Sequence, residues 1–300
     1  MSSHRQPSEG HLAVHPLPVH KPQPSFGERV RRLNKKRQEM IRPVQEHPRD
    51  FVLLTIRGLA SRLGTDPATV VRVVRALGFA GYREFKAYLH ELSIATATSL
   101  DAMRSDDHSR SSLGSLGSSA LEMDLKNLQA LRNTLDLPRI EALVRRLYRA
   151  RRIVVIAGDM ASGLADALDY KFTLLGLPSI SAVSAGRIFH VVGALGKGDL
   201  VIAITFQRGL RQTIEGLKQA SGNGAYCVAI TNSAASPAAR FADEYFLTPV
   251  QAPFSQSYAA PHALINVLMT VCANHRRGRT LSILKRVDRE QRTGFRWYND

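Results

Sequence analysis

Five short, strongly apolar runs follow one another after residue 151, and helical stretches separate them. The runs are residues 152–158, 178–183, 199–206, 226–232 and 244–250. Nearly continuous apolar runs are typical of strands covered on both faces, and their alternation with helices indicates parallel βαβ units. The sequence therefore predicts an α/β domain over residues 120–276, with a doubly wound, mainly parallel five-stranded sheet.

A pair of short helices is predicted further upstream. Thr55 can cap the first helix, and Gly64 supplies the permissive backbone that ends it. Asp66 is a candidate N-cap for the second helix, and Pro67 fits its first position, where the missing N–H costs nothing. This arrangement predicts an all-α helix-turn-helix domain, to which we assign residues 26–93.

The second helix of this pair separates its residues by type. At 100° per residue, one face holds the apolar residues Val70, Val73, Val74 and Leu77. The other face holds the candidate DNA-binding residues Ala68, Arg72 and Arg75, with Thr69 at its edge. Small residues allow close approach to a major groove, and arginine can contact guanine or phosphate. A helical hairpin with solvated arginines would show the same spacing, so the spacing alone leaves both interpretations open.

The charge of the chain favours a polyanionic partner. The formal net charge is +16, and the first 92 residues carry 16 Lys and Arg against 8 Asp and Glu. Within this basic part, Lys86 and Arg83 lie on a further predicted helix as candidates for contact with the DNA backbone. RNA or a membrane surface is the alternative partner, but the aromatic residues lie at packing positions rather than among the basic ones, which disfavours RNA.

Three segments have compositions unlike those of folded domains. Residues 1–25 are rich in proline and predict a disordered tail. Residues 94–119 are rich in serine and glycine and predict a linker. Residues 277–300 carry many arginines on few apolar residues and predict a loosely ordered basic tail.

Export and metal binding find no support in the sequence. No apolar run is long enough to span a membrane, and the first 25 residues lack the apolar core of a secretory signal. Cys227 and Cys272 lie far apart in apolar stretches, without metal-ligand spacing, which predicts buried, reduced thiols. We expect a cytoplasmic protein that has no cofactor and no membrane partner.

Residues 65–89, TDPATVVRVVRALGFAGYREFKAYL, resemble the head of RpiR-type transcriptional regulators. In that family a helix-turn-helix is joined to a sugar isomerase (SIS) domain. The resemblance runs from about Phe26 to Leu92 and resumes from about Arg139 to Asn274. It implies three groove-facing residues, Thr69, Arg72 and Arg75. The family further implies a homo-oligomer, a dimer or a tetramer.

The loop after the first apolar run is a candidate effector site. Ligands of open parallel sheets collect beyond the carboxyl ends of the strands, where helix N-termini present free N–H groups to anions. Gly158, Asp159 and Ser162 lie at such a position. They resemble the SIS pattern Gly-x-Gly-x-Ser, with Met160 in place of the second glycine. A plain helix cap is the alternative.

The loop after the third run occupies the place of the SIS phosphate cradle, Ser-x-Ser-Gly-x-Thr. Thr205 keeps a hydroxyl, whereas Gln207 replaces the second serine and Arg208 the glycine. Leu210 replaces the threonine, which leaves Thr213 one turn further along. Arg208 and the helix N-terminus could still hold a phosphate. The effector is therefore either a phosphosugar or another small anionic metabolite.

Two functions remain open at this point. The first is a transcriptional regulator whose affinity for double-stranded operator DNA depends on a small effector. The alternative is a sugar-phosphate isomerase or lyase with a fused helical head, for which Glu215 and His190 are the candidate acid–base residues. Neither belongs to a recognisable catalytic constellation, so we expect a protein that is not an enzyme. Ser233 and Ser236, in the loop after the fourth run, are predicted helix caps.

Overall fold

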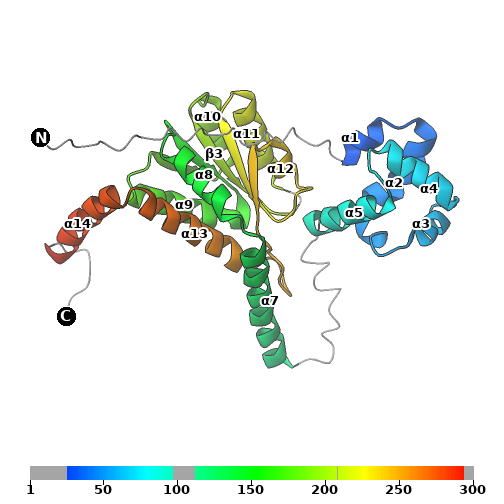
Figure 1. Ribbon diagram of the computed structural model, residues 1–300, viewed down its shortest axis with the longest axis horizontal. Helices are drawn as coiled ribbons and strands as arrows, with labels where there is room; N and C mark the ends of the chain where they lie inside the picture. Colours follow the sequence, from blue (N-terminus) through cyan, green and yellow to red (C-terminus); the bar gives the residue numbers. More distant parts are fainter. Residues whose placement is uncertain (1–25, 97–111, 208, 294–300) are drawn as a thin grey trace, which may run out of the picture.

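The computed structural model describes residues 26–96, 112–207 and 209–293, so the predicted N-terminal tail and most of the predicted linker lie outside the described residues. The first of these segments is entirely helical and forms a separate head (Figure 1). Its elements are α1 (Phe26–Arg31), α2 (Lys35–Glu46), η1 (Pro48–Asp50), α3 (Ile56–Arg62), α4 (Pro67–Ala76) and α5 (Tyr82–Thr96). The predicted helix-turn-helix is thus α3 and α4.

Local interactions fix the ends of α3 and α4 where the sequence predicts them. The Thr55 hydroxyl accepts a hydrogen bond from the backbone N–H of Gly58, at 3.2 Å. Gly64 has φ +63°, a left-handed conformation that glycine adopts without strain. The Asp66 carboxylate then accepts from the N–H of Thr69, at 2.9 Å. The predicted caps are therefore confirmed.

The head has its own hydrophobic core, to which α4 contributes its whole apolar face. Val70, Val73, Val74 and Leu77 are all buried, as predicted. They join a cluster that includes Phe79, Phe85 and Leu89 from the segment after α4. Because this core closes within residues 26–96, the opposite face of α4 is left to solvent.

The second domain is built on a five-stranded sheet. The strands are β1 (Ile153–Ile156), β2 (Ser179–Ala182), β3 (Leu200–Ile204), β4 (Tyr226–Thr231) and β5 (Glu244–Leu247). All neighbouring strands pair in parallel, in the order β2-β1-β3-β4-β5. The predicted doubly wound sheet is confirmed, and its switch point lies between β1 and β3, where the order of the strands reverses direction.

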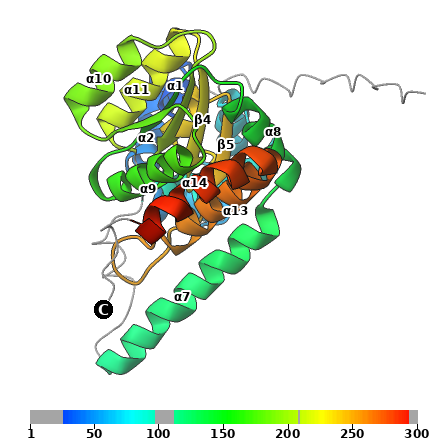
Figure 2. The same ribbon diagram turned by 90° about the vertical axis from the view of Figure 1, so that its left-hand side faces the viewer.

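Helices cover both faces of this sheet (Figures 1 and 2). One face packs against α8 (Leu137–Leu147), α9 (Ser162–Leu174) and α13 (Ala259–His275). The other face packs against α10 (Ala185–Gly193), α11 (Arg211–Gly222) and α12 (Pro237–Phe241). Alternate residues of β1 point to opposite sides, since Ile153 and Val155 belong to the first core and Val154 and Ile156 to the second.

The structure differs from the sequence prediction at both ends of this domain. Helix α7 (Leu113–Thr134) begins inside the range assigned to the linker, because the Ser112 hydroxyl caps it by accepting from the N–H of Ser115 at 3.2 Å. The predicted loose tail instead contains the helix α14 (Arg277–Thr293). Arg279 ties this helix to the domain by donating to the carbonyl oxygen of Gly176 at 2.7 Å.

Helix α7 also packs less than its leucine spacing indicates. Its C-terminal part is anchored through Leu131, which is buried, and through Asn127, whose amide donates to the carbonyl oxygen of Gln251 at 2.7 Å. Its N-terminal part projects away from the sheet (Figures 1 and 2), and Leu121 and Leu125 are 68% and 52% exposed. The leucines of α7 therefore pack against the following domain only in the second half of the helix.

The two cysteines agree with their predicted state. Cys227 and Cys272 are buried and form no disulfide. Burial raises the pKa of each thiol to about 12. Within the described residues, no helix is long and apolar enough to cross a bilayer.

Candidate DNA-binding helix and effector site

The outer face of α4 presents the residues predicted to contact DNA. Ala68, Arg72 and Arg75 are exposed, and Thr69 is half-buried at the edge of this face. The Thr69 hydroxyl donates to the Asp66 carboxylate at 2.6 Å and accepts from the guanidinium of Arg72 at 2.8 Å. The hydrogen bond from Thr69 holds the pKa of Asp66 below its usual value. A chain of three polar side chains therefore lies along the first turns of the helix.

The predicted backbone-contact residues lie on α5. Arg83 is exposed, whereas Lys86 is half-buried and its ammonium donates to the carbonyl oxygen of Leu53 at 3.4 Å. Lys86 thus already has a partner inside the head, and its role in DNA binding remains a prediction.

The two loops predicted to bind the effector lie against each other at the carboxyl edge of the sheet. A Cβ added at Gly158, after β1, would collide with the side chains of Leu210 and Gln212, after β3. Because glycine has no side chain, Gly158 allows the loop after β3 to pack directly against the loop after β1. This contact brings the predicted residues of the first loop, Gly158, Asp159 and Ser162, close to the predicted residues of the loop after β3.

Hydrogen bonds shape the loop after β3. The N–H of Gln207 donates to the side-chain oxygen of Asn232 at 2.7 Å, and the N–H of Leu210 donates to the Thr205 hydroxyl at 3.1 Å. Thr205 is buried and braces its own loop. Arg208, the cation predicted to hold an anion, lies outside the described residues.

Thr213 stands out among the predicted effector residues. It lies in the first turn of α11, is fully buried, and its hydroxyl has no hydrogen-bond partner within the described parts of the chain. A buried hydroxyl without a partner is costly, and nearly all buried polar groups in folded proteins have one. Ser162, by contrast, is half-buried at the start of α9.

Unusual backbone conformations gather at the same edge of the sheet. Asp159, Gln207 and Ser255 have φ of 53°, 54° and 59°, which are left-handed values for residues other than glycine. Ser255 and Met160 also touch, at 3.7 Å between hydroxyl and sulfur, so the loop before α13 reaches the loop after β1. Strain of this kind costs about 1–3 kcal/mol per residue and is commonly found at ligand sites.

Tyr258 is a site residue that the sequence reasoning missed. It immediately precedes α13, and its ring lies 5.4 Å from that of Phe206 at the end of β3. Burial raises its pKa to about 12, with a further contribution from the charge of Asp159. No local pattern marks Tyr258, because its neighbours in the site come from distant parts of the chain.

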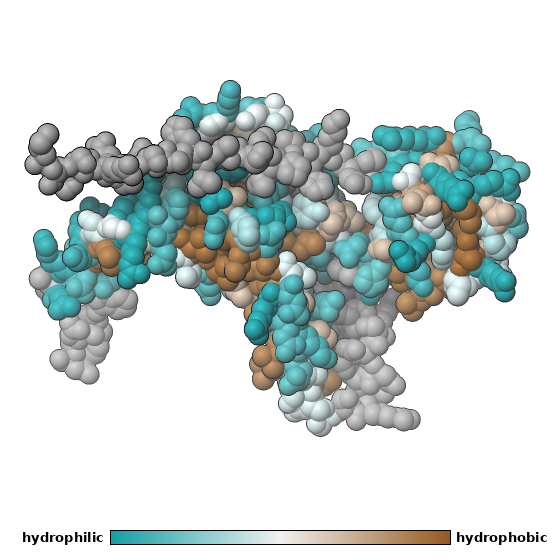
Figure 3. Space-filling view, in the orientation of Figure 1, coloured by the Kyte–Doolittle hydropathy of each residue, from teal (hydrophilic) through white to brown (hydrophobic). Residues whose placement is uncertain are grey.

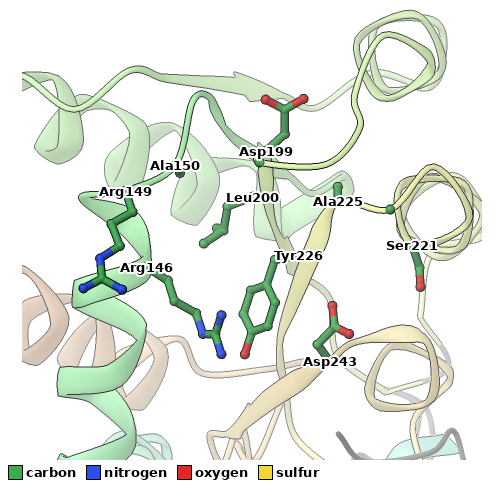
Figure 4. Close-up of a pocket in the computed structure, with 11 residues that line it drawn as sticks. Arg146, Arg149, Ala150, Asp199, Leu200, Ser221, Ala225, Tyr226 and Asp243 are labelled. Carbon is green, nitrogen blue, oxygen red and sulfur yellow. The ribbon is translucent and has the colours of Figure 1, made fainter. Parts of the chain in front are cut away.

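A cavity of about 410 Å³ lies at the opposite end of the sheet, beside the starts of β3 and β4 (Figure 4). Arg146 points toward Tyr226, with its guanidinium carbon 4.2 Å from the ring centroid, while Arg149 points away. Asp199 is paired with Arg151 and Arg152, each at 2.7 Å. The helices α9, α10, α11 and α12 each follow a strand and begin at the carboxyl edge, so that edge is the better anion site.

The candidate acid–base residues do not form a catalytic group. Glu215 on α11 and His190 on α10 are exposed, and neither lines this cavity or the one at the carboxyl edge described below. The described residues contain no group of three or more His, Cys, Asp or Glu side chains that could hold a metal ion.

Comparison with known proteins matches both halves of the chain. The model of the helix-turn-helix domain of the rpiR family matches residues 24–96, and the SIS domain model matches residues 146–271. An uncharacterized HTH-type transcriptional regulator of Haemophilus influenzae is 26% identical over 220 residues, which are 73% of this chain and 76% of the relative. The bifunctional protein glk of Burkholderia mallei is 28% identical over 191 residues, 62% of this chain, but the chain spans only 29% of that relative.

Two crystal structures share the fold. The sugar isomerase domain of an RpiR transcription factor from Sphaerobacter thermophilus is 28% identical, with a TM-score of 0.56, and the match covers 58% of this chain and 98% of that one. NanR of Vibrio vulnificus, complexed with ManNAc-6P, is 19% identical, with a TM-score of 0.57 over 88% of this chain and 96% of that one.

A helix-turn-helix head followed by a SIS domain defines a class of DNA-binding regulator. The two domain models match in that order, and together they span most of the described residues. The chain belongs to the RpiR-type family of transcriptional regulators.

Proposed function

We propose that this protein binds operator DNA through α4 and that a small anionic metabolite, bound at the carboxyl edge of the sheet, changes its affinity for that DNA. The observation that carries the first part is the division of α4 into two faces. Val70, Val73 and Val74 are buried in the head, while Arg72 and Arg75 are exposed on the other side. A helix held in this way can enter a major groove without disturbing its own core.

The contact between the loops after β1 and β3 supports the effector site. Gly158 permits this contact, Thr213 offers a buried hydroxyl without a partner among the described residues, and Asp159 and Gln207 carry strained backbone. A phosphosugar is the effector class that we favour, because the fold neighbour NanR is complexed with ManNAc-6P. Another small anion is the alternative, since Gln207 replaces the second serine of the SIS cradle and Leu210 replaces its threonine.

We further propose that the protein acts as a homodimer in the cytoplasm, where two heads can read two half-sites about one helical turn apart. The exposed leucines of α7, Leu121 and Leu125, support an interface on that helix. Figure 3 shows apolar atoms along the projecting helix and on the adjacent face of the domain. A ligand that favours one arrangement of the two heads would then change the affinity for the operator.

A mobility-shift assay with the promoter region of the protein's own gene tests DNA binding. Replacing Arg72 and Arg75 together by alanine removes two cations from the groove face. We expect at least a tenfold loss of affinity and a smaller dependence of the binding constant on salt, because fewer counterions are released. Unchanged affinity and salt dependence would overturn the proposal.

The matched control is the double variant Arg145→Ala, Arg292→Ala. Both residues are exposed, both pair with a carboxylate four positions away in their own helix, and both lie outside the head. The control therefore changes the net charge by the same amount. If it weakened binding as much as the α4 variant, overall charge rather than α4 would account for the interaction.

A further inference from the structure

A cavity of about 750 Å³ lies between the head and the carboxyl edge of the sheet. The head contributes His90 and Glu91 from α5, which extends toward the SIS domain in Figure 1. The SIS domain contributes Asn232 after β4 and Thr248 after β5. Of the residues predicted from the sequence to bind the effector, this cavity includes Gln207 alone.

Direct contacts hold the two walls of the cavity together. The Ser233 hydroxyl, which is buried, donates to the carbonyl oxygen of Glu91 at 3.1 Å and lies 3.2 Å from the Glu91 carboxylate. Of the two predicted helix caps, Ser236 caps α12 by accepting from the N–H of Ala239 at 3.2 Å, whereas Ser233 does not cap this helix. The loop after β4 therefore joins the head at the edge of this cavity.

Thr248 is the second observation that points to a ligand here. The residue is fully buried and lines the cavity, yet its hydroxyl has no hydrogen-bond partner in the described residues. Leaving such a group unsatisfied costs about 1–3 kcal/mol, and a ligand in the cavity could supply the missing partner.

The lining indicates the chemistry of that ligand. Amide, hydroxyl and imidazole groups predominate among its polar side chains, and Leu53 and Val250 add apolar surface. Among the described residues of the lining, the opposite charges of Arg49 and Glu91 offset each other and leave no excess of cations for an anion. Many hydrogen-bonding groups around an apolar patch suit a sugar ring, which carries hydroxyls at its rim and C–H groups on its faces.

We propose that this interdomain cavity binds a small neutral molecule rich in hydroxyl groups, of the size of a monosaccharide. Such a ligand contacts the head and the sheet edge at once, so its binding stabilises the head in its position on the SIS domain. The site adjoins the anion site at the β1 and β3 loops and shares Gln207 with it. The inference also holds whether or not α4 binds DNA, because it concerns the protein alone.

Thermal unfolding of the full chain with unphosphorylated sugars provides the test. The probes are glucose, galactose, mannose, N-acetylglucosamine and myo-inositol, each at millimolar concentration. We expect at least one of them to raise Tm by several degrees. Hydrogen exchange with that sugar should slow in two segments, residues 88–93 and 247–255, which belong to the two walls of the cavity.

The variants Thr248→Val and Thr213→Val form a matched pair, since both remove a fully buried hydroxyl that has no partner in the described chain. Only Thr248 lines the cavity. We expect Thr248→Val to abolish the rise in Tm and Thr213→Val to retain it. Loss in both variants, or in Thr213→Val alone, would place the sugar at the anion loops and overturn the proposal. If none of the five sugars changed Tm, the proposal of a sugar site would also be overturned. The mobility-shift assay tests DNA binding separately, so its result would not depend on this outcome.

Discussion

Arg240 in α12 and Glu28 in α1 form an ion pair at 2.9 Å, which joins the SIS domain to the head. The arginine is 23% exposed and the glutamate 40%, so solvent partly screens the pair. Together with the bond between Ser233 and Glu91, it holds the head against the domain at two points. Each of these two polar contacts between the head and the domain can be removed by a single substitution.

Replacing Glu28 by glutamine should loosen the head without unfolding either domain. A partly exposed pair contributes at most about 1 kcal/mol, so we expect faster hydrogen exchange in α1 and α12 but nearly unchanged Tm. The control is Glu39→Gln, an exposed glutamate of α2. Equal exchange rates in the Glu28 variant and the native chain would show that this pair does not hold the head.

Gly216→Ala should destabilise the SIS domain. A Cβ at this position in α11 would lie 2.5 Å from the Cγ2 of Ile188, a branched side chain buried between α10 and the sheet. Overpacking of this kind costs about 1–3 kcal/mol, which we expect as a lower free energy of unfolding in urea.

Gly163→Ala in α9 is the control for that substitution. It makes the same change in a helix, where the added Cβ meets nothing within 4 Å. Alanine favours helix over glycine by about 1 kcal/mol, so this variant should be as stable as the native chain or more stable. If both variants behaved alike, steric contact with Ile188 would not be the cause.

Asp199 should make stability depend on pH on the acid side. Hydrogen bonds from Arg151 and Arg152 lower its pKa from the ordinary value of 3.8. A carboxylate with a lowered pKa in the folded state stabilises the fold fully above its unfolded pKa, and this contribution is lost as the pH falls. Urea unfolding between pH 3 and pH 7 should therefore show a smaller pH dependence for Asp199→Asn than for the native chain. The exposed Asp288, in the variant Asp288→Asn, is the control.

Leu121 and Leu125 should be needed for self-association. Replacing both by serine removes apolar surface from the projecting part of α7, and we expect the dimer to dissociate at concentrations where the native chain remains dimeric. Sedimentation velocity gives the mass directly. A second variant, Leu281→Ser with Leu284→Ser, changes two leucines of similar exposure on α14 and should leave the mass unchanged. A monomeric native chain would contradict the dimer proposal itself.

Local features of the fold could be predicted from the sequence because their causes are local. The caps at Thr55 and Asp66 act over three residues, and the apolar face of α4 follows from helical periodicity. The five strands could be placed because burial on both faces requires nearly continuous apolar runs. The helix-turn-helix could be predicted from the first two features, and the α/β architecture from the third.

Features that depend on distant partners could not be predicted. The bond between Ser233 and Glu91 joins residues 142 positions apart, and neither residue carries a local signal for it. Tyr258 and Thr248 belong to the carboxyl edge only because the chain after β5 folds back over it. Composition also misled the assignment of the two flanking segments, since a serine cap starts α7 and contacts of Arg279 and Thr280 with the rest of the domain hold α14.

The guanidinium of Arg72 is exposed, but one of its nitrogens already donates a hydrogen bond to the Thr69 hydroxyl in the protein without DNA. A base or phosphate that binds this guanidinium must compete with the hydroxyl, so part of the gain is an exchange of one hydrogen bond for another. The exchange lowers the free energy of binding only when the new partner forms a hydrogen bond of good geometry with Arg72. On the proposed function, we therefore expect Arg72 to contribute more to discrimination between DNA sequences than to nonspecific binding.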